Sequence, residues 1–472
     1  MSATRWRYAD VLMSHDAIVV GAGVAGLTAA DRLVAAGRDV IALEARERVG
    51  GRTLTVDVPG MPGLRVDSGG QWVGPAQHAL LAELERFGLT TIDQGGEGED
   101  LISFGGRLRR YTGSTPRLGL LTMLDVGVAL QRFEKLATSV DLGHPWATPN
   151  ADKLDGLTFE SWILATCRTR RGREFFRICC EAVFATEAAN LSLLHALFYS
   201  HSGGGLEHLI STDGGAQHAR VDGGMQQLSE HLAAGLGDRL RLGEPVTAIA
   251  AEGTGVQVTT EHGTHDASRV IVAIPPTLAG RLRFDPVMPS TRDALTQRMP
   301  QGSVIKCQAV YDRPFWRDSG LSGEAVGDTS PVKVVFDGTP PGEGSPGVLV
   351  AFIEAADAIQ LSAVTAEVRQ AEVLEVLAHY MGDDARHPVA FVERDWSTEP
   401  WTRGCYGAHL PPGAWTQVGA ALREPVGPIH WAGTETAERW CGYIDGAITS
   451  GERAAMEVDA VLPRSATTDE RA

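Results

Sequence analysis

The sequence predicts an α/β protein in which helices cover a mostly parallel sheet, together with a second, discontinuous α+β domain. Three observations carry this prediction. An apolar run at residues 17–20 is followed by a glycine-rich turn, a helical pattern and a second apolar run. Strand-like runs recur at residues 246–249, 255–261 and 268–274, as in a meander that returns to the sheet. The chain of 472 residues is also too long for one compact core.

The first apolar run leads into a nucleotide-binding pattern. Gly21, Gly23 and Gly26 have G-x-G-x-x-G spacing, and the second strand expected at residues 39–43 ends at Glu44. Such glycines let backbone N–H groups and a helix N-terminus approach a pyrophosphate, while the carboxylate accepts hydrogen bonds from ribose hydroxyls. We therefore predict a Rossmann-type dinucleotide site. The alternative is that the glycines only allow the helix to pack closely on the strand.

The residues after Glu44 indicate which dinucleotide binds. The chain continues ARERVGGRT and later reads DSGGQWVGP. Here it resembles the flavin-dependent amine oxidase superfamily, in which E-A-R-x-R-x-G-G-R follows the ribose-binding acid, so FAD is the expected cofactor. The resemblance implies that Arg52 lies against the pyrophosphate and that the backbone near Gly70 approaches the flavin ring. The FAD contacts expected in this region are Ala45, Arg46, Gly51, Arg52, Gly69, Gly70, Gln71 and Trp72.

The domain organisation follows from where these patterns lie. Residues 159–198 are rich in helical periodicity, whereas residues 303–311 and 347–355 alternate as strands do. The discontinuous arrangement resembles the monoamine oxidase architecture, with a FAD-binding domain of the GR2, amine-oxidase-like type. We expect residues 1–84, 214–296 and 401–462 to form the FAD-binding domain, residues 85–213 and 297–400 the substrate domain, and residues 463–472 a disordered tail.

Composition excludes several classes of protein. The net charge of −17, from 42 basic and 59 acidic residues, argues against nucleic-acid binding. It would attract cationic small molecules, although solubility explains it equally well. No run of 18 apolar residues and no hydrophobic C-terminal tail occurs, so we expect a cytoplasmic protein without a membrane anchor. The 6 cysteines and 14 histidines have no ligand spacing, so no metal is expected. A homodimer is one assembly left open.

The second half of the chain narrows the resemblance to the monoamine oxidases. Residues 302–316 (GSVIKCQAVYDRPFW), CYGAHLPPGAWTQ and WAGTETAERWCGYIDGA match that subfamily closely. The resemblance implies that Tyr406 and Tyr443 flank the substrate amine in front of the flavin. Their electron-rich faces would favour the positive charge that develops as an amine becomes an iminium. Core packing is the plainer explanation for a single tyrosine near the C-terminus.

Lys306 and Cys405 are the other reactive candidates. A lysine inside an apolar run is costly unless it is used or paired. By resemblance Lys306 would hold a water near flavin N5 and assist oxygen reduction, whereas the alternative is a strand-edge lysine that reaches solvent. Cys405 matches the cysteine that forms a thioether to the flavin in mitochondrial enzymes, so covalent FAD is expected. Its neighbours differ from the mitochondrial pattern, and a free buried thiol is the alternative.

Further site residues are implied by the resemblance alone. Ile210 and Gln217 fall at a cavity gate and a substrate-facing amide, and Trp396 lies near the flavin ring or packs in the core. Val246 would meet the adenine through its backbone. Gly433 and Glu435 lie in a glycine-containing loop before the last helix, and Glu435 is expected to contact the flavin side.

Together these features predict an FAD-dependent amine oxidase of the monoamine oxidase type. A neutral primary or secondary amine would enter a largely apolar cavity and be oxidised to an imine that hydrolyses to an aldehyde, while O2 is reduced to hydrogen peroxide. An amino-acid oxidase would need an arginine for the substrate carboxylate, and a polyamine oxidase would need acids for distal ammonium groups. The remaining alternative is not an oxidase: it is a redox-neutral, flavin-binding isomerase of the same fold.

Overall fold

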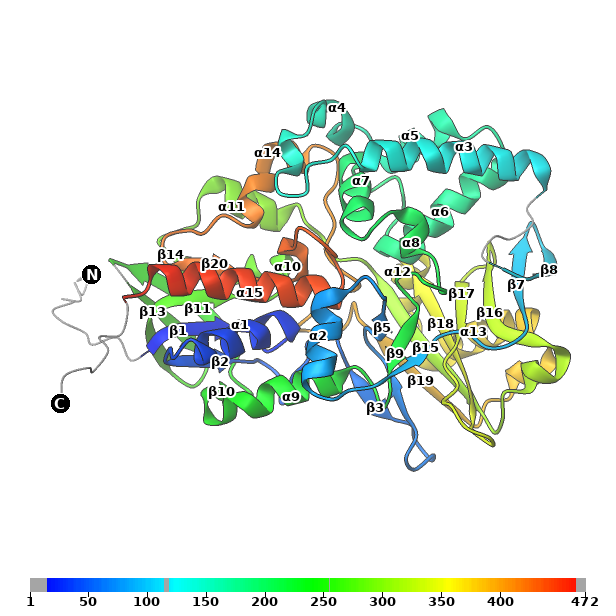
Figure 1. Ribbon diagram of the computed structural model, residues 1–472, viewed down its shortest axis with the longest axis horizontal. Coiled ribbons are helices and arrows are strands. Elements are labelled where there is room, and N and C mark those ends of the chain that lie inside the picture. Colours follow the sequence, from blue (N-terminus) through cyan, green and yellow to red (C-terminus); the bar gives the residue numbers. More distant parts are fainter. Residues whose placement is uncertain (1–14, 114–118, 254, 464–472) are drawn as a thin grey trace.

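The computed structural model describes residues 15–113, 119–253 and 255–463, which build two large sheets side by side with a helical layer above their junction (Figure 1). The predicted disordered tail lies outside the described residues, apart from Pro463. Within these three stretches, no helix combines the length and apolarity needed to cross a bilayer.

The first sheet has eight strands in the order β10–β2–β1–β13–β12–β11–β14, with β20 paired to β13. β1 (His15–Val20) lies parallel to both β2 (Val40–Leu43) and β13 (Thr264–Val272). The meander into β13 returns the chain to the parallel sheet, so the predicted α/β fold is confirmed. The remaining strands are β10 (Leu240–Arg241), β11 (Val246–Glu252), β12 (Gly255–Thr260), β14 (Arg283–Asp285) and β20 (Ile429–Trp431).

Helix α1 (Val24–Ala35) begins directly after the glycine-rich turn and packs against α9 (Gln226–Leu236) and α15 (Ile444–Val461). A Cβ built on Gly26 would lie 1.9 Å from the carbonyl oxygen of Gly21, so only glycine allows the helix to approach the strand this closely. The other helices around this sheet are α2 (His78–Arg86), α10 (Pro276–Ala279) and α11 (Ser290–Gln297).

The second sheet has seven strands in the order β19–β15–β18–β17–β16–β7–β8. β15 (Val304–Tyr311) runs antiparallel between β18 (Gly347–Glu354) and β19 (Ala390–Asp395). Every residue of β15 and β18 is buried, which explains their nearly continuous apolar sequences. The other strands are β7 (Glu99–Phe104), β8 (Arg107–Tyr111), β16 (Leu321–Gly327) and β17 (Val332–Asp337).

Two helices that the sequence analysis missed lie beside this sheet, namely α12 (Ala355–Ser362) and α13 (Ala366–Met381). The prediction for residues 297–400 named strands only. The helical signal was present, since the buried apolar residues Val373, Val376, Leu377 and Tyr380 recur at helical spacing. They pack in one cluster with apolar side chains of β15 and β18.

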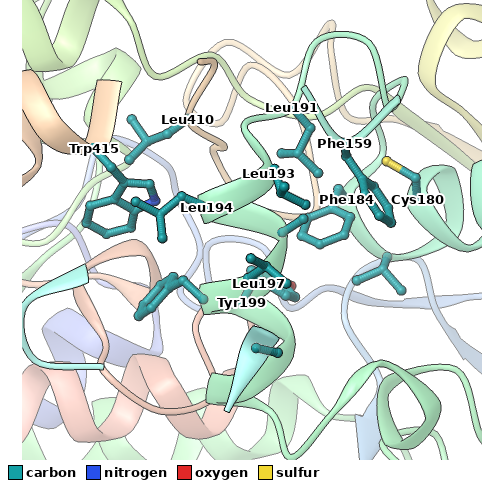
Figure 2. Close-up of a cluster of buried hydrophobic side chains, with 14 of the residues drawn as sticks. Phe159, Cys180, Phe184, Leu191, Leu193, Leu194, Leu197, Tyr199, Leu410 and Trp415 are labelled. Atoms are coloured by element: carbon teal, nitrogen blue, oxygen red, sulfur yellow. The ribbon is translucent and has the colours of Figure 1, made fainter. Parts of the chain in front are cut away.

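A layer of helices covers the junction of the sheets (Figure 1). Its core contains Phe159, Phe184, Leu197 and Trp415, which Figure 2 shows gathered around one buried helix. The predicted helix-rich region at residues 159–198 is therefore confirmed. The helices of the layer are α3 (Leu120–Ala137), α4 (Ala151–Asp155), α5 (Phe159–Thr166), α6 (Arg170–Phe184), α7 (Leu193–Ser202), α8 (Leu206–Leu209) and α14 (Ala414–Val418).

Short elements complete the fold and link its parts. β5 (Trp72–Val73) and β6 (Thr91–Asp93) flank β9 (Ala219–Val221), while β3 (Thr55–Asp57) pairs with β4 (Arg65–Asp67). All strands of the eight-stranded sheet come from the three segments expected to bind FAD, and all strands of the seven-stranded sheet come from the other two. The domain boundaries themselves stay a prediction.

The 3₁₀ helices are η1 (Pro145–Ala147), η2 (Gly237–Arg239), η3 (Phe315–Ser319), η4 (Asp383–Arg386), η5 (Gly419–Leu422) and η6 (Thr434–Thr436).

Candidate active site

A cavity of about 900 Å³ extends from the glycine-rich turn after β1 to the helical layer and the seven-stranded sheet. We call its two ends the nucleotide end and the substrate end. The substrate end is lined mainly by apolar side chains of α3, α6, β16, β17 and β18, including Leu130, Ile178, Val326, Val335 and Phe352. The cavity therefore joins the two sheets through one continuous space.

The nucleotide end is built from the turn after β1 and the loop after β2. The buried carboxylate of Glu44 accepts hydrogen bonds from the backbone N–H of Ala22 (2.7 Å) and of Arg46 (3.1 Å). These bonds fix the acid at the carboxyl end of β2, next to Gly21 and Gly23 on the cavity lining. In this position it is available to ribose hydroxyls.

The residues at this end fit a dinucleotide such as FAD. Gly21, Gly23 and Gly51 leave the cavity wall without side chains, so a ligand can approach the backbone closely. The Nε of Arg46 is buried and finds no hydrogen-bond acceptor in the described part of the chain. A bare glycine wall, a fixed carboxylate and an unpaired donor together suit an anionic, ribose-containing ligand.

Arg52 links the nucleotide end to the Cys405–Tyr406 segment. Its guanidinium donates to both carboxylate oxygens of Glu435 (2.6 and 3.0 Å) and to the carbonyl oxygen of Tyr406 (2.8 Å). Burial opposes ionisation of Glu435, but the Arg52 charge and hydrogen bonds outweigh it and lower the pKa of that carboxyl. Glu435 thus lies behind Arg52, which itself lines the cavity.

Lys306 lies in the middle of β15 with only 2% of its surface exposed. Its ammonium donates to the carbonyl oxygen of Gly69 (2.8 Å) and to the side-chain oxygen of Gln71. The alternative of a strand-edge lysine that reaches solvent is therefore wrong. Burial lowers the pKa of Lys306 to about 7, although the negative charge of Asp67 partly offsets this effect.

Tyr406 and Tyr443 both line the cavity although they come from different loops. The Tyr443 ring packs edge-on against Trp440, with 5.2 Å between ring centroids. The Tyr406 hydroxyl donates to Glu354 (2.8 Å), and its ring lies 6.1 Å from that of Phe352. Each ring therefore packs against its own neighbouring side chains, and both residues border the space that a ligand would occupy.

Cys405 also lines the cavity as a buried free thiol. Burial raises its pKa to about 12, while the nearby charges of Arg52 and Lys306 act in the opposite direction. The thiol is thus mainly protonated before any ligand binds. Covalent attachment of FAD stays a prediction.

The residues expected around the substrate differ in position. Ile210 and Gln217 line the cavity, and the Gln217 amide nitrogen donates to the carbonyl oxygen of Leu209 (2.8 Å). Trp396 is fully buried, and its indole N–H donates to the carbonyl oxygen of Ser68 (2.9 Å). It packs in the cluster that contains Cys405, as the core-packing interpretation expects, and is absent from the cavity lining in the described chain.

Most of the predicted site residues meet at this one cavity. Those on its lining are Gly21, Gly23, Glu44, Arg46, Gly51, Arg52, Gly70, Gln71, Trp72, Ile210, Gln217, Cys405, Tyr406, Gly433 and Tyr443. Seven others are absent from the lining: Gly26, Ala45, Gly69, Val246, Lys306, Trp396 and Glu435. Of these seven, Lys306 and Glu435 form side-chain hydrogen bonds with lining residues.

The carboxylates at the substrate end were not predicted from the sequence. Glu324 and Glu354 line it, together with Glu134 and Glu207, so the expected largely apolar cavity contains several acids. Burial raises the pKa of both Glu324 and Glu354 to about 7. Glu354 at the end of β18 is, like Lys306, a charged residue in an otherwise apolar run, and this signal could have identified it from the sequence.

Comparison with known proteins identifies the family. The family described as flavin containing amine oxidoreductase matches residues 24–459. A Mycobacterium tuberculosis protein named as a flavin-containing monoamine oxidase is 41% identical over 447 residues, covering 95% of this chain and 97% of its own. An L-amino acid dehydrogenase of Synechocystis is 39% identical, covering 95% and 96%.

Solved structures give the same result. Putrescine oxidase with bound putrescine has a TM-score of 0.91 at 37% identity, covering 94% of this chain and 99% of its own. Cyclohexylamine oxidase from Brevibacterium oxydans IH-35A has a TM-score of 0.90 at 32% identity, with the same coverage. The chain therefore belongs to the flavin-containing amine oxidoreductases and is an FAD-dependent enzyme that oxidises amines.

Proposed function

We propose that the enzyme oxidises a primary or secondary monoamine to an imine that hydrolyses to an aldehyde, with O2 reduced to hydrogen peroxide. The observation that carries this proposal is the position of Tyr406 and Tyr443 on one cavity whose other end fits the nucleotide. Two aromatic faces confine an amine nitrogen and favour the positive charge that develops on it during oxidation.

FAD and the residues around the cavity would have different roles in the reaction. Bound FAD supplies the electron-accepting chemistry. The two tyrosines orient the amine, and the apolar side chains around them exclude water from the reacting carbon. Lys306 places a cation, fixed by Gly69 and Gln71, just behind the lining, where it would stabilise negative charge formed during oxygen reduction.

The charges of the substrate end favour amines over amino acids. In the described chain, the arginines on the cavity lining are Arg46 and Arg52, both at the nucleotide end. A substrate carboxylate would therefore meet carboxylates such as Glu324 instead of a guanidinium. Like charges in a buried site repel strongly, so this arrangement opposes an α-amino acid and attracts a cation.

A peroxide assay on the purified enzyme tests the proposal. Benzylamine and tyramine should release hydrogen peroxide, while phenylalanine should give little or none. Addition of an amine substrate in the absence of oxygen should bleach the flavin. Admission of air should then restore the flavin colour and release hydrogen peroxide. A flavin that stays oxidised with every amine would overturn the proposal and favour the redox-neutral isomerase.

A diamine is the second candidate substrate, because Glu324 offers a site for a distal ammonium group. Its carboxylate is held by Gln94 (3.5 Å) and Thr212 (3.3 Å), and the charged neighbours that influence its pKa, Asp100 and Asp337, are both acids. Glu324→Gln should then lower kcat/KM for putrescine far more than for benzylamine. Equal losses for the two amines would exclude this role.

We also propose that Cys405 would be joined to FAD by a thioether. The S–H bond and one C–H bond of a flavin methyl group would break as the S–C bond forms, and the two electrons released would pass to the flavin and then to O2. The place of Cys405 on the cavity lining, beside the cations of Arg52 and Lys306, supports the bond. Acid precipitation should leave the yellow colour in the protein pellet, and Cys405→Ala should move it to the supernatant. If the yellow colour of the wild-type protein appeared in the supernatant, the covalent bond would be rejected.

The cytoplasmic location stays a prediction, which cell fractionation would test. The homodimer also stays a prediction, which sedimentation of the purified protein would test.

A further inference from the structure

Glu354 is a buried acid of the substrate cavity that none of the roles above uses. It is the last residue of β18 and precedes α12, yet its side chain makes no capping hydrogen bond to that helix. Only 4% of its surface is exposed, and it lines the cavity that also contains Tyr406 and Tyr443. Glu354 therefore borders the ligand space and does not cap the helix.

The two carboxylate oxygens of Glu354 have different environments. Oε1 accepts a hydrogen bond of 2.8 Å from the Tyr406 hydroxyl. Oε2 is buried and finds no donor among the described residues. A buried carboxylate oxygen without a donor is energetically unfavourable. The unpaired oxygen is thus available to a donor that a ligand brings.

The groups around Glu354 do not neutralise it. Lys333 on β17 is the nearby cation, but it already pairs with Glu181 on α6 and with Asp357 on α12 (3.5 Å). Burial raises the pKa of Glu354 to about 7, the Tyr406 hydrogen bond lowers it, Glu181 raises it and Lys333 lowers it. At neutral pH the side chain can therefore both lose and accept a proton.

We propose that Glu354 binds the incoming substrate as an ammonium ion through Oε2 and accepts its proton, so that the amine becomes neutral inside the cavity. This proposal deepens the amine oxidation established above, because it names the group that prepares the substrate. Alkylammonium ions, like the lysine side chain, have a pKa of about 10 in water, so almost all substrate arrives protonated. Oxidation needs the nitrogen lone pair, which the ammonium form lacks.

The proton transfer balances without any further reactant. The N–H bond breaks, an O–H bond forms at Oε2, and the electron pair stays on nitrogen. An ammonium–carboxylate pair thereby becomes an amine and a carboxylic acid, with no change in net charge. Burial disfavours both charged forms and so drives this exchange. The acid returns its proton to water when the product leaves.

Wild-type enzyme supplies the first test. Anaerobic stopped-flow measurement gives the second-order rate constant of flavin reduction between pH 6 and 10 for amines with different ammonium pKa values. The proposal expects a rise with a midpoint near pH 7 that is the same for every amine. A midpoint that follows each amine's own pKa would overturn it.

Glu354→Gln supplies the second test, since the amide keeps the shape and cannot take the proton. Only the neutral amine would then react, which is about one molecule in a thousand at pH 7. At pH 7 the second-order rate constant of flavin reduction should be at least about 100-fold lower in the variant than in wild type. At pH 10 it should be within about threefold of wild type. Recovery within one protein sample shows that the variant is folded and holds FAD. Equal loss at all pH values would overturn the proposal, and so would no loss at any pH.

Tyr406→Phe separates proton transfer from mere support of the tyrosine ring. If Glu354 only positions Tyr406, loss of the hydroxyl should reproduce the pH profile of Glu354→Gln. If Glu354 takes the proton, Tyr406→Phe should keep the substrate-independent midpoint and move it to higher pH, because the hydrogen bond that lowers the pKa of Glu354 is lost. Coincident profiles for the two variants would reject the proposal.

Discussion

Lys306 shows how a single buried charge is accommodated and used. In the middle of β15 its ammonium has two oxygen partners, Gly69 and Gln71, and both belong to the segment expected to approach the flavin ring. Two partners do not replace full hydration, so the pKa falls to about 7. The charge of Lys306 is therefore sensitive to pH in the physiological range.

Lys306→Met should slow reoxidation of the reduced flavin by about 100-fold, because removal of one group that stabilises developing charge typically lowers a rate by this factor. The rate of flavin reduction should change much less. In the wild-type enzyme the reoxidation rate should fall as pH rises through about 7, because the ammonium loses its proton there. Stopped-flow mixing of reduced enzyme with O2 measures both effects. Unchanged reoxidation in the variant would exclude this role.

Glu435 is the second residue with a large expected effect, because its charge is matched by Arg52 in a buried pair. Glu435→Gln leaves the guanidinium without its counter-charge and should cost about 3–5 kcal/mol of unfolding free energy. The lowered pKa of Glu435 implies that its contribution is present above the ordinary carboxyl pKa and is lost as pH falls below it.

Denaturant unfolding of the two proteins measures this cost. The matched control is Asp318→Asn, which breaks the exposed pair between Asp318 and Arg313 and should cost no more than about 1 kcal/mol. Similar costs for the buried and exposed pairs would show that Arg52 finds another partner.

At the scale of elements, the contact between α1 and β1 fixes the nucleotide end. Gly26→Ala would place a methyl group 1.9 Å from the carbonyl oxygen of Gly21, so the helix must move away from the strand. We expect a loss of at least about 2 kcal/mol in stability and weaker FAD retention. Thermal unfolding and the flavin absorbance per protein measure the two effects.

Gly235→Ala is the matched control in a neighbouring helix. Gly235 is an exposed residue within α9, and a Cβ there would meet only one atom, at 4.0 Å. The substitution should stabilise the protein by about 0.5–1 kcal/mol, since alanine favours the helix. If Gly26→Ala were as harmless as this control, close packing would not be the reason for the glycine.

The elements also show where sequence reasoning succeeds. The continuous apolar run at residues 17–20 predicts a buried parallel strand, and residues 268–274 are predicted as a strand of the meander that returns to the sheet. β1 and β13 confirm these two strands. Helix α13 was not predicted, although it lies in the same stretch as the strands β15 and β18. Its apolar residues recur at helical spacing, so tertiary context is not needed to predict this helix.

At the scale of the whole molecule, the site combines segments that are far apart in the chain. Arg52 and Tyr406 are 354 residues apart and yet share a hydrogen bond. The tyrosines, Lys306 and Cys405 were found because long motifs carry them. Glu324 and Glu354 lie outside those motifs, and their exposure to the cavity depends on how β16 and β18 meet the helical layer, which no local pattern encodes.

Because the β1–α1 turn and residues 433–443 both contribute to the cavity lining, FAD should stabilise these two segments together. A ligand that binds only the native state adds about 2.7 kcal/mol at 100 times its Kd. Removal of FAD, with Cys405→Ala to prevent any covalent bond, should increase hydrogen exchange in the β1–α1 turn and in residues 433–443 in parallel. Helix α13 packs on the seven-stranded sheet through Val373 and Leu377, away from the cavity lining, and should change little. Equal loss of protection in α13 would instead mean that FAD holds the entire molecule together as one cooperative unit.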